Sequence, residues 1–118
     1  HYPMEAFQVL NDTIKEQIYE HLDREYPREG CGVIVLENNE HKWYPVTNIA
    51  KSDDDFKFDP IEYMRINLKS KPLAIVHSHP DTTSEPSIAD RQNCNFLNLD
   101  FYIFSLPDKN LTILKPNE

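Results

Sequence analysis

The side chains of this chain with the clearest chemical potential are two histidines and an aspartate. His77 and His79 follow an apolar run, residues 73–76. Side chains two residues apart in a strand point to the same face, so both imidazoles can reach one metal ion. Asp90 adds a carboxylate from the next element. Two imidazoles and a carboxylate suit zinc, and three protein ligands leave the fourth position open for water, as in catalytic zinc sites.

A hydrolytic zinc site also needs a base that lies near the metal without binding it. Glu29 is the best candidate, because it precedes the chain's only two glycines, Gly30 and Gly32, where the backbone can approach a metal closely. Ser87 is the candidate oxyanion donor. It stands three residues before Asp90 at an expected helix start, so the two side chains lie on the same side of that helix.

Every one of these residues also has an interpretation without chemistry. His77 and His79 could be polar residues at a strand end. Asp90 could be a solvated acid in a first helical turn, and Ser87 a simple N-cap. Glu29 could be a surface carboxylate. Taken singly, the ordinary interpretation is preferred for Ser87 and Glu29, whereas the joint pattern favours the metal site.

The remaining reactive side chains give weaker signals. Cys31 and Cys94 are too few for a disulfide scaffold and are predicted to be reduced, mostly buried thiols. Cys31 is close to Glu29 in sequence, so a thiol mechanism stays open as a lesser alternative, although a nucleophile would need a paired base and a lowered pKa. His21 and His41 have no partner at metal-binding spacing and are predicted to lie on the surface.

The elements that position these side chains begin with a helix. Residues 4–9, which precede it, are predicted to be an extended run. Asn11-Asp12-Thr13 is expected to supply its N-cap, with Glu16 placed as the far side of a capping box to Thr13, and Pro27 to end the helix. Its apolar face is predicted from side chains at three- and four-residue spacing, namely Ile14, Ile18, Tyr19, Leu22 and Tyr26.

A hairpin is expected next. Residues 33–36 are apolar without interruption, which predicts a strand buried on both faces. Asn38-Asn39 is a hairpin turn signal, and residues 41–46 are predicted to return as a second strand. Pro45 places that strand at an edge of the sheet or at an irregular end. Trp43 is expected in the core, together with the phenylalanines and tyrosines.

A second helix is predicted to begin at Asp59-Pro60, as N-cap and first turn. Its expected apolar face consists of Tyr63, Ile66 and Leu68. Lys71-Pro72 is expected to break this helix before the next strand begins.

The candidate ligands fall on the elements that follow. Residues 73–79 are predicted to form the strand that carries both histidines, and residues 80–86 a loop. A third helix, begun by Pro86-Ser87, carries Asp90. Two further strands are expected at residues 100–106 and 111–114. The resulting order β-α-β-β-α-β-α-β-β predicts an α/β protein of the α+β type, with a mixed sheet flanked by helices rather than a doubly wound fold.

Length and composition limit the function. A chain of 118 residues is expected to be a single domain, residues 1–118, in which residues 1–3 read as a residual tag before Met4. The net charge of −8 argues against nucleic acid or an anionic membrane as partner. No stretch approaches the ~20 apolar residues of a membrane span. No signal peptide is visible, so a cytoplasmic, reducing compartment is expected.

The spacing of the candidate residues is similar to a known motif. His77-Ser78-His79, seven residues, Ser87, two residues and Asp90, with an upstream Glu29, resemble the JAMM (MPN+) metalloprotease motif. Residues 26–32, 48–50 and 56–63 resemble prokaryotic JAB domains. Residues 86–91 and 105–107 look most like the N-terminal domains of phage tail assembly K proteins. The resemblance covers roughly residues 10–107.

This resemblance implies a fold and an activity. The implied fold is the JAB/MPN, cytidine-deaminase-like architecture, a curved mixed sheet between helices. The implied enzyme is a zinc metallopeptidase that cleaves peptide or isopeptide bonds. By position, the metal ligands would be His77, His79 and Asp90, the general base Glu29, and the oxyanion partner Ser87.

The resemblance leaves several functions open. One alternative is a non-catalytic assembly or scaffold module of a phage tail, and another is an isopeptidase that releases a ubiquitin-like sulfur carrier. The implied partners are a protein or peptide substrate, phage tail proteins and an NlpC/P60 domain, which often follows in the phage proteins. The host cytoplasm or the virion tail would be the location of a phage-encoded protein.

Overall fold

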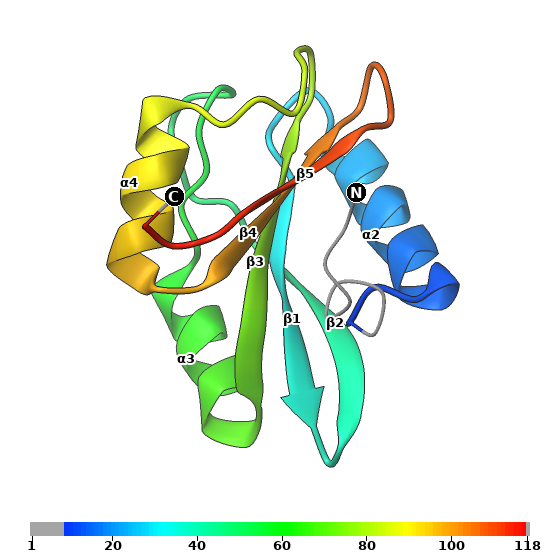
Figure 1. The fold of residues 1–118 in the computed structure, drawn as a ribbon, viewed down its shortest axis with the longest axis vertical. Helices are drawn as coiled ribbons and strands as arrows, with labels where there is room; N and C mark the ends of the chain where they lie inside the picture. The colour runs from blue at the N-terminus through cyan, green and yellow to red at the C-terminus, as the bar shows by residue number, and fades with distance from the viewer. Residues whose placement is uncertain (1–8, 118) are drawn as a thin grey trace.

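The computed structural model describes residues 9–117 and shows one five-stranded sheet with helices on both of its faces (Figure 1). The strand order is β2-β1-β3-β4-β5. The strands are β1 (Cys31–Glu37), β2 (Glu40–Val46), β3 (Lys71–His79), β4 (Asp100–Ser105) and β5 (Leu111–Leu114). Neighbouring β3 and β4 run parallel and the other neighbours antiparallel, which confirms the predicted mixed sheet.

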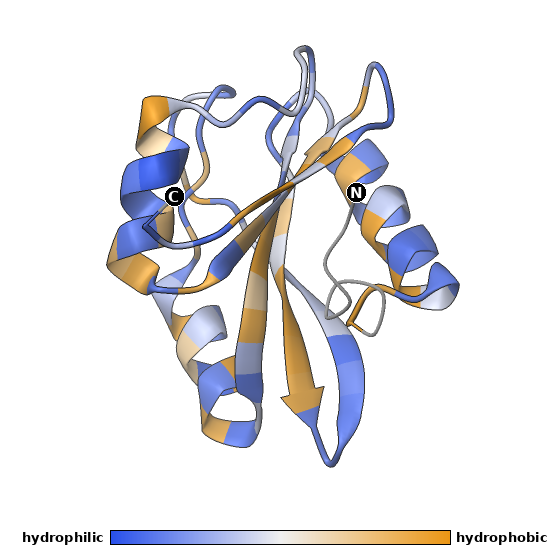
Figure 2. Ribbon diagram, in the orientation of Figure 1, coloured by the Kyte–Doolittle hydropathy of each residue, from blue (hydrophilic) through white to orange (hydrophobic). Residues whose placement is uncertain are grey.

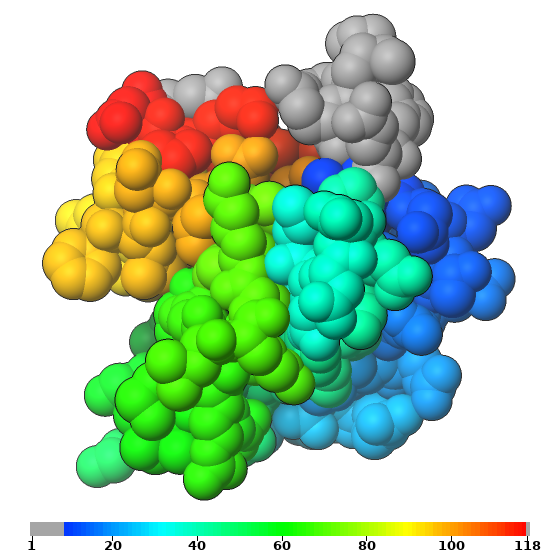
Figure 3. Space-filling view, turned by 90° about the horizontal axis from the view of Figure 1, so that it is seen from below, coloured from blue at the N-terminus to red at the C-terminus, as the bar shows by residue number. Residues whose placement is uncertain are grey.

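The helices cover the two faces unequally. α2 (Asp12–Glu25) lies on one face, and α3 (Pro60–Lys69) and α4 (Ile88–Leu97) lie on the other (Figure 1). The central strands are the most hydrophobic part of the ribbon, whereas the helices alternate in hydropathy (Figure 2). Seen from the end that carries the β1–β2 hairpin, this hairpin separates α2 from α3 (Figure 3). None of the helices within residues 9–117 has the length and apolar character needed to cross a membrane.

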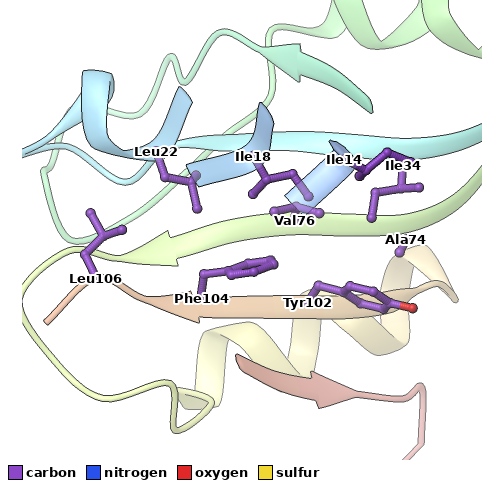
Figure 4. Packing of buried hydrophobic residues seen from close by; sticks show 9 residues of the cluster. All are labelled: Ile14, Ile18, Leu22, Ile34, Ala74, Val76, Tyr102, Phe104 and Leu106. Carbon is purple, nitrogen blue, oxygen red and sulfur yellow. The ribbon is translucent and has the colours of Figure 1, made fainter. Parts of the chain in front are cut away.

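The face under α2 holds a largely apolar core (Figure 4). Three residues of α2 at helical spacing, Ile14, Ile18 and Leu22, point onto the sheet. They pack against the side chains that β1, β3 and β4 direct to this face, which include Ile34, Ala74, Val76, Tyr102 and Phe104. The alternation of side chains along each strand therefore sends every second residue to α2.

The opposite face of the same strands holds the second core. Its sheet residues are the alternate ones: Val33, Val35, Ile75, Phe101 and Ile103. Ile66 of α3 and Cys94 of α4 pack against them. His77 and His79 follow Ile75 at two-residue spacing on this face, so the histidines continue the row of core side chains toward the end of β3.

The hairpin turn is as predicted. Asn38 and Asn39 both have positive φ, 52° and 64°, and they join Glu37 to Glu40 as a two-residue loop. Asparagine tolerates this backbone better than most residues, and such turns match the twist of the flanking strands. β2 lies at the edge of the sheet, as Pro45 indicated.

Asn11, one of the three residues expected to supply the N-cap, does cap the first helix, but the predicted capping box of Thr13 and Glu16 is wrong. The N-cap of α2 is Asn11, whose Oδ1 accepts a hydrogen bond from the backbone N–H of Ile14 at 2.8 Å, and not Thr13. The helix ends at Glu25, so Tyr26 falls outside the helical repeat and is 52% exposed instead of belonging to the apolar face. The extended run predicted for residues 4–9 and the residual tag lie outside the described residues, apart from residue 9.

The exposure of two apolar side chains and the start of one strand also differ from the prediction. α3 begins as predicted, with Asp59 as N-cap and Pro60 in the first turn, but Leu68 is 79% exposed. At about 100° per residue, Leu68 lies about 200° around the helix from Ile66, on the outer side. Phe96 is also exposed rather than in the core. Residues 71 and 72 belong to β3 and do not merely end the helix.

Candidate metal centre

The three predicted ligands meet where β3 ends and α4 begins. His77 Nε2 lies 3.0 Å from Asp90 Oδ1, and His79 Nε2 lies 3.1 Å from Asp90 Oδ2. All three side chains are buried, and their ligand atoms lie within 4.8 Å of one another. One carboxylate therefore spans two imidazoles, a spacing that one small cation between them would fit.

The first turn of α4 fixes the carboxylate. Ser87 is the N-cap, and its Oγ accepts a hydrogen bond from the backbone N–H of Asp90 at 3.0 Å. In return, the backbone N–H of Ser87 donates to Asp90 Oδ2 at 2.9 Å. This reciprocal capping box shows that Ser87 does act as an N-cap. It also orients Asp90 toward the histidines, because the carboxylate is hydrogen-bonded to the backbone at the start of α4.

His79 is held in the tautomer that a metal ligand needs. Its Nδ1 lies 2.7 Å from the carbonyl oxygen of Thr83, which can only accept, so Nδ1 carries the proton. In a neutral ring Nε2 then presents a lone pair to Asp90 Oδ2. Two acceptors at 3.1 Å repel each other unless a proton or a cation lies between them. A metal-ligating histidine is typically oriented by such a bond at its other nitrogen.

His77 forms the buried floor of the centre. Its ring is fully buried, stacks on Phe56 at a centroid distance of 4.5 Å and meets Phe101 edge-on at 5.7 Å. Within the described part of the chain, neither ring nitrogen makes a well-directed hydrogen bond. Buried polar atoms without partners are costly, and a cation bound at Nε2 would satisfy one of these two. The donor set and its unsatisfied atoms thus fit a zinc ion.

The electrostatics of the three ligands favour their metal-binding forms. Burial lowers the pKa of His77 below its ordinary value and keeps the ring neutral. Burial alone would raise the pKa of Asp90, but the two imidazoles and the Ser87 N–H outweigh it, so this pKa lies well below the usual range. Burial likewise opposes the charged form of His79, yet Asp90 and the Thr83 carbonyl raise its pKa. Without a metal, Asp90 and the Thr83 carbonyl thus favour protonation of His79.

Glu29 lies in the same cleft as His79 and Asp90. It is 6% exposed, and burial raises its pKa to about 8, with a further contribution from Asp90 that exceeds those of Asp55 and Asp54, while His79 opposes the shift. No described residue donates a hydrogen bond to its carboxylate, so the group is free to interact with whatever occupies the cleft. A carboxylate with a pKa near neutrality is suited to proton transfer.

The backbone around Glu29 is tied directly to the strand that carries the ligands. The N–H of Gly30 donates to Ser78 Oγ at 2.9 Å, and the N–H of Ser78 donates to the carbonyl of Gly30 at 3.0 Å. Ser78 points away from the side of β3 that carries the histidines. These two hydrogen bonds hold the chain at Glu29 beside the end of β3 that carries His77 and His79.

The two glycines serve packing and not approach to the metal. A Cβ on Gly30 would lie 2.7 Å from the Leu22 side chain, and one on Gly32 would lie 2.3 Å from Trp43. Both contacts are sterically forbidden. The glycines therefore let α2 and β2 pack closely, and this packing sets the position of Glu29 indirectly.

Sequence reasoning missed Asn48 as a supporting residue. The side chain is buried, and its amide group donates to the carbonyls of Glu29 at 2.8 Å and Asp55 at 3.0 Å. Its carbonyl oxygen accepts from the backbone N–H groups of Ala50 and Lys57. Asn48 therefore joins the backbone of Glu29 to the loop before α3. The segment 48–50 had been noticed only as part of a resemblance, because nothing local in the sequence shows that this amide is buried.

The other candidate residues lie outside the centre. Cys31 pairs with His77 in the β1–β3 register, but burial raises the pKa of its thiol far above the ordinary value, which disfavours the nucleophilic thiolate. Cys94 is also buried, as predicted, and forms no disulfide within the described residues. His21 is half-buried against Trp43 rather than on the open surface. His41 does not approach the centre, since it lies on β2.

The centre opens to solvent through a cleft of about 810 Å³. Glu29, Ser87 and Asp90 line it together with residues of the loops 52–55 and 80–85. His77 lies beneath the cleft, since it is fully buried and does not line it. The cleft therefore gives solvent access to His79 and Asp90.

Comparison with known proteins identifies the family. The model of prokaryotic homologs of the JAB domain matches residues 12–113, most of the chain. The chain belongs to the prokaryotic JAB-domain family. Among its JAB-family relatives, tail tip assembly protein K of Escherichia phage N15 is 34% identical over 102 residues, which are 86% of this chain and 42% of that protein. A UPF0758 protein of Aeromonas hydrophila is 30% identical over 92 residues, 76% of this chain and 39% of that protein.

Solved structures agree with the JAB/MPN fold. A solution structure of a Desulfitobacterium hafniense protein superposes with a TM-score of 0.68 at 25% identity, covering 87% of this chain and 78% of that one. A JAB1/MPN domain protein of Archaeoglobus fulgidus superposes with a TM-score of 0.56 at 20% identity, covering 86% and 83%. The predicted JAB/MPN architecture is therefore confirmed. The chain spans about two fifths of the length of the two curated relatives named above.

Proposed function

We propose that this JAB domain is a zinc-dependent hydrolase that cleaves peptide or isopeptide bonds, and that the described residues act as one such domain. The observation that carries the proposal is that a buried His-His-Asp cluster and a buried, unpartnered glutamate share one cleft. A structural zinc site would need a fourth protein ligand and no free base. Three ligands, a base and an open cleft are what a hydrolytic centre needs.

In this mechanism, His77, His79 and Asp90 hold the ion. A bound zinc ion supplies Lewis acidity, which acidifies water and polarises the scissile carbonyl. Glu29 accepts the proton of the attacking water and returns it to the leaving amine. The hydroxyl of Ser87 keeps its own hydrogen while its oxygen accepts from Asp90, so it can donate to the carbonyl oxygen as negative charge develops.

The decisive experiment separates metal binding from catalysis. Purified protein is loaded with zinc, and its metal content is measured by inductively coupled plasma mass spectrometry beside hydrolysis of a peptide library. We expect about one equivalent of zinc. Glu29→Gln should retain the zinc and lose at least about 100-fold in rate, because it removes the base. Zinc absent from the wild type, or full activity of Glu29→Gln, would refute the proposal.

A second candidate is a non-catalytic module in phage tail assembly. Two observations favour it: the similarity to a tail tip assembly protein, and the large apolar side chains exposed on α3 and α4. Tail proteins would then be the partners, and the virion tail the location. A phage that carries Glu29→Gln in this domain distinguishes the two, because normal assembly and infection would favour the scaffold. Release of a ubiquitin-like sulfur carrier is a third candidate, tested with such a carrier fused to a target.

A further inference from the structure

The cleft at the candidate metal centre is lined on all sides by carboxylates. Glu29 and Asp90 belong to the centre itself. Four more acids surround it and are called the rim carboxylates here: Asp54, Asp55, Asp81 and Glu85. They come from two separate loops, one before α3 and one before α4. No lysine or arginine lines the cleft among the residues that the structure describes.

The charge of the rim carboxylates is not compensated within the protein. No described lysine or arginine lies within ion-pair distance of them. Asp81 accepts a hydrogen bond from the hydroxyl of Tyr26 at 2.8 Å, and Asp55 accepts one from the backbone N–H of Phe56 at 2.8 Å. Both donors are neutral. A zinc ion would balance Glu29 and Asp90, so the four rim charges would remain.

A separate observation points to a ligand in this cleft. The carboxylate of Glu29 lines the cleft, is more than nine-tenths buried and has no hydrogen-bond or ion-pair partner among residues 9–117. This carboxylate faces the cleft and no described donor, so a donor is expected from the occupant of the cleft. This feature is independent of the rim, which is exposed on both loops.

We propose that the cleft selects a peptide segment that carries lysine or arginine beside the bond to be cut. Cleavage of that bond rests on the proposed function, whereas the binding preference does not. Cationic side chains would neutralise the rim carboxylates, and an acidic segment would be repelled by them. A second metal ion is the less suitable occupant, because the only metal-type cluster within residues 9–117 is His77, His79 and Asp90.

The test measures binding without relying on hydrolysis. Two fluorescent ten-residue peptides, identical except for four lysines in one and four glutamines in the other, are titrated with the zinc-loaded protein at low and at physiological salt. Fluorescence anisotropy reports the binding, and mass spectrometry reports whether each peptide stays intact. We expect the lysine peptide to bind at least about tenfold more tightly at low salt, with a smaller difference at higher salt.

A matched pair of variants separates the cleft from the overall charge of −8. Asp54→Asn/Glu85→Gln removes two rim charges, and Glu16→Gln/Glu40→Gln removes two exposed charges that lie outside the cleft lining. We expect the rim variant to weaken lysine-peptide binding by at least about threefold and the control variant by less than half as much. Circular dichroism checks that each variant is folded.

Three outcomes would overturn the inference. Equal losses in the two variants would show that only net charge attracts the peptide. Equal binding of the lysine and glutamine peptides would remove the preference altogether. Loss of a second equivalent of zinc in the rim variant alone would assign the rim to a metal. If instead the lysine peptide binds selectively but is never cleaved in any zinc-loaded sample, the inference survives and the proposed hydrolase fails.

Discussion

The face of the sheet under α2 and the face under α3 and α4 are made by alternate residues of the same strands, yet they differ in chemistry. Under α2 the buried side chains are mainly apolar, from Ala74 and Val76 on β3 to Phe104 on β4. The polar exception at the end of β3 is Ser78, whose hydroxyl oxygen accepts a hydrogen bond from the Gly30 N–H. On the other face the row changes from Ile75 to His77 and His79. The histidines find partners there because the loop after β3 and the first turn of α4 fold back over the strand end.

This difference separates the source of stability from the site of chemistry. The α2 face buries mostly large apolar side chains, and the buried hydroxyl of Ser78 on this face already has a partner within the fold, so this face contributes mainly through burial. The other face accepts buried imidazoles and carboxylates that are satisfied only in part, which is costly unless a ligand is bound. If this comparison is right, mutations and zinc removal should act on the two faces in different ways.

The largest effect is expected from truncating the apolar face. Phe104 is fully buried and meets Tyr19 of α2 edge-on at 5.2 Å. Phe104→Ala should lower the free energy of unfolding by about 3–5 kcal/mol, because it leaves a large cavity. Urea denaturation with and without zinc measures this. The loss should be the same in both conditions, and a loss that depends on zinc would break the comparison.

The next effect is the gain in stability from zinc. Free zinc at about a thousand times its dissociation constant should stabilise the wild type by about 4 kcal/mol, because only the folded state assembles the three ligands. Thermal denaturation before and after treatment with a chelator measures the shift. In His77→Ala the shift should disappear, since one ligand is missing. A zinc-dependent shift that persists in this variant would place the metal elsewhere.

Glu29 should make the metal-free protein sensitive to pH. Its pKa rises from an unfolded value near 4.5 to about 8 in the folded state, so the folded state holds the proton more tightly. This contribution to stability is complete below pH 4.5 and is lost as the pH rises to about 8. Relative to the wild type, metal-free Glu29→Gln should therefore gain about 3–4 kcal/mol between pH 5 and pH 8.

Urea denaturation of both proteins at a series of pH values isolates the contribution of Glu29, because the other titrating groups are common to both. Parallel stability curves would contradict the buried, proton-binding carboxylate. With zinc bound, the nearby positive charge should lower the pKa of Glu29 and flatten the difference between the curves.

The smallest effects come from two helix caps, one on each face. Ser87→Ala and Asn11→Ala each remove an N-cap side chain and should each cost about 1 kcal/mol of unfolding free energy. Only Ser87→Ala should also weaken zinc binding, by about tenfold, because Ser87 orients the ligand Asp90. Competition with a chromogenic zinc chelator measures the affinity. Equal affinities in the two variants would show that the cap does not support the centre.

Much of the fold follows from local signals in the sequence. The uninterrupted apolar runs of β1, β3 and β4, the Asn38-Asn39 turn and the caps at Asp59 and Ser87 each depend on near neighbours, so they could be predicted. The wrong predictions also have local causes. Asn11 precedes Thr13 and caps the helix first, and Leu68 is apolar without lying on the buried side. Hydrophobicity alone does not give the rotation of a helix.

The sequence by itself determined the types and spacing of the candidate ligands and the pairing of Ser87 with Asp90, because a strand period and one helical turn are short-range geometry. Only the tertiary structure decided that Glu29 is buried beside the centre with no partner among residues 9–117, since β1 must pair with β3 to bring it there. The same holds for Asn48 and for the acidic rim, which join segments distant in sequence. Their chemistry depends on burial and on neighbouring charges, and both are properties of the folded chain.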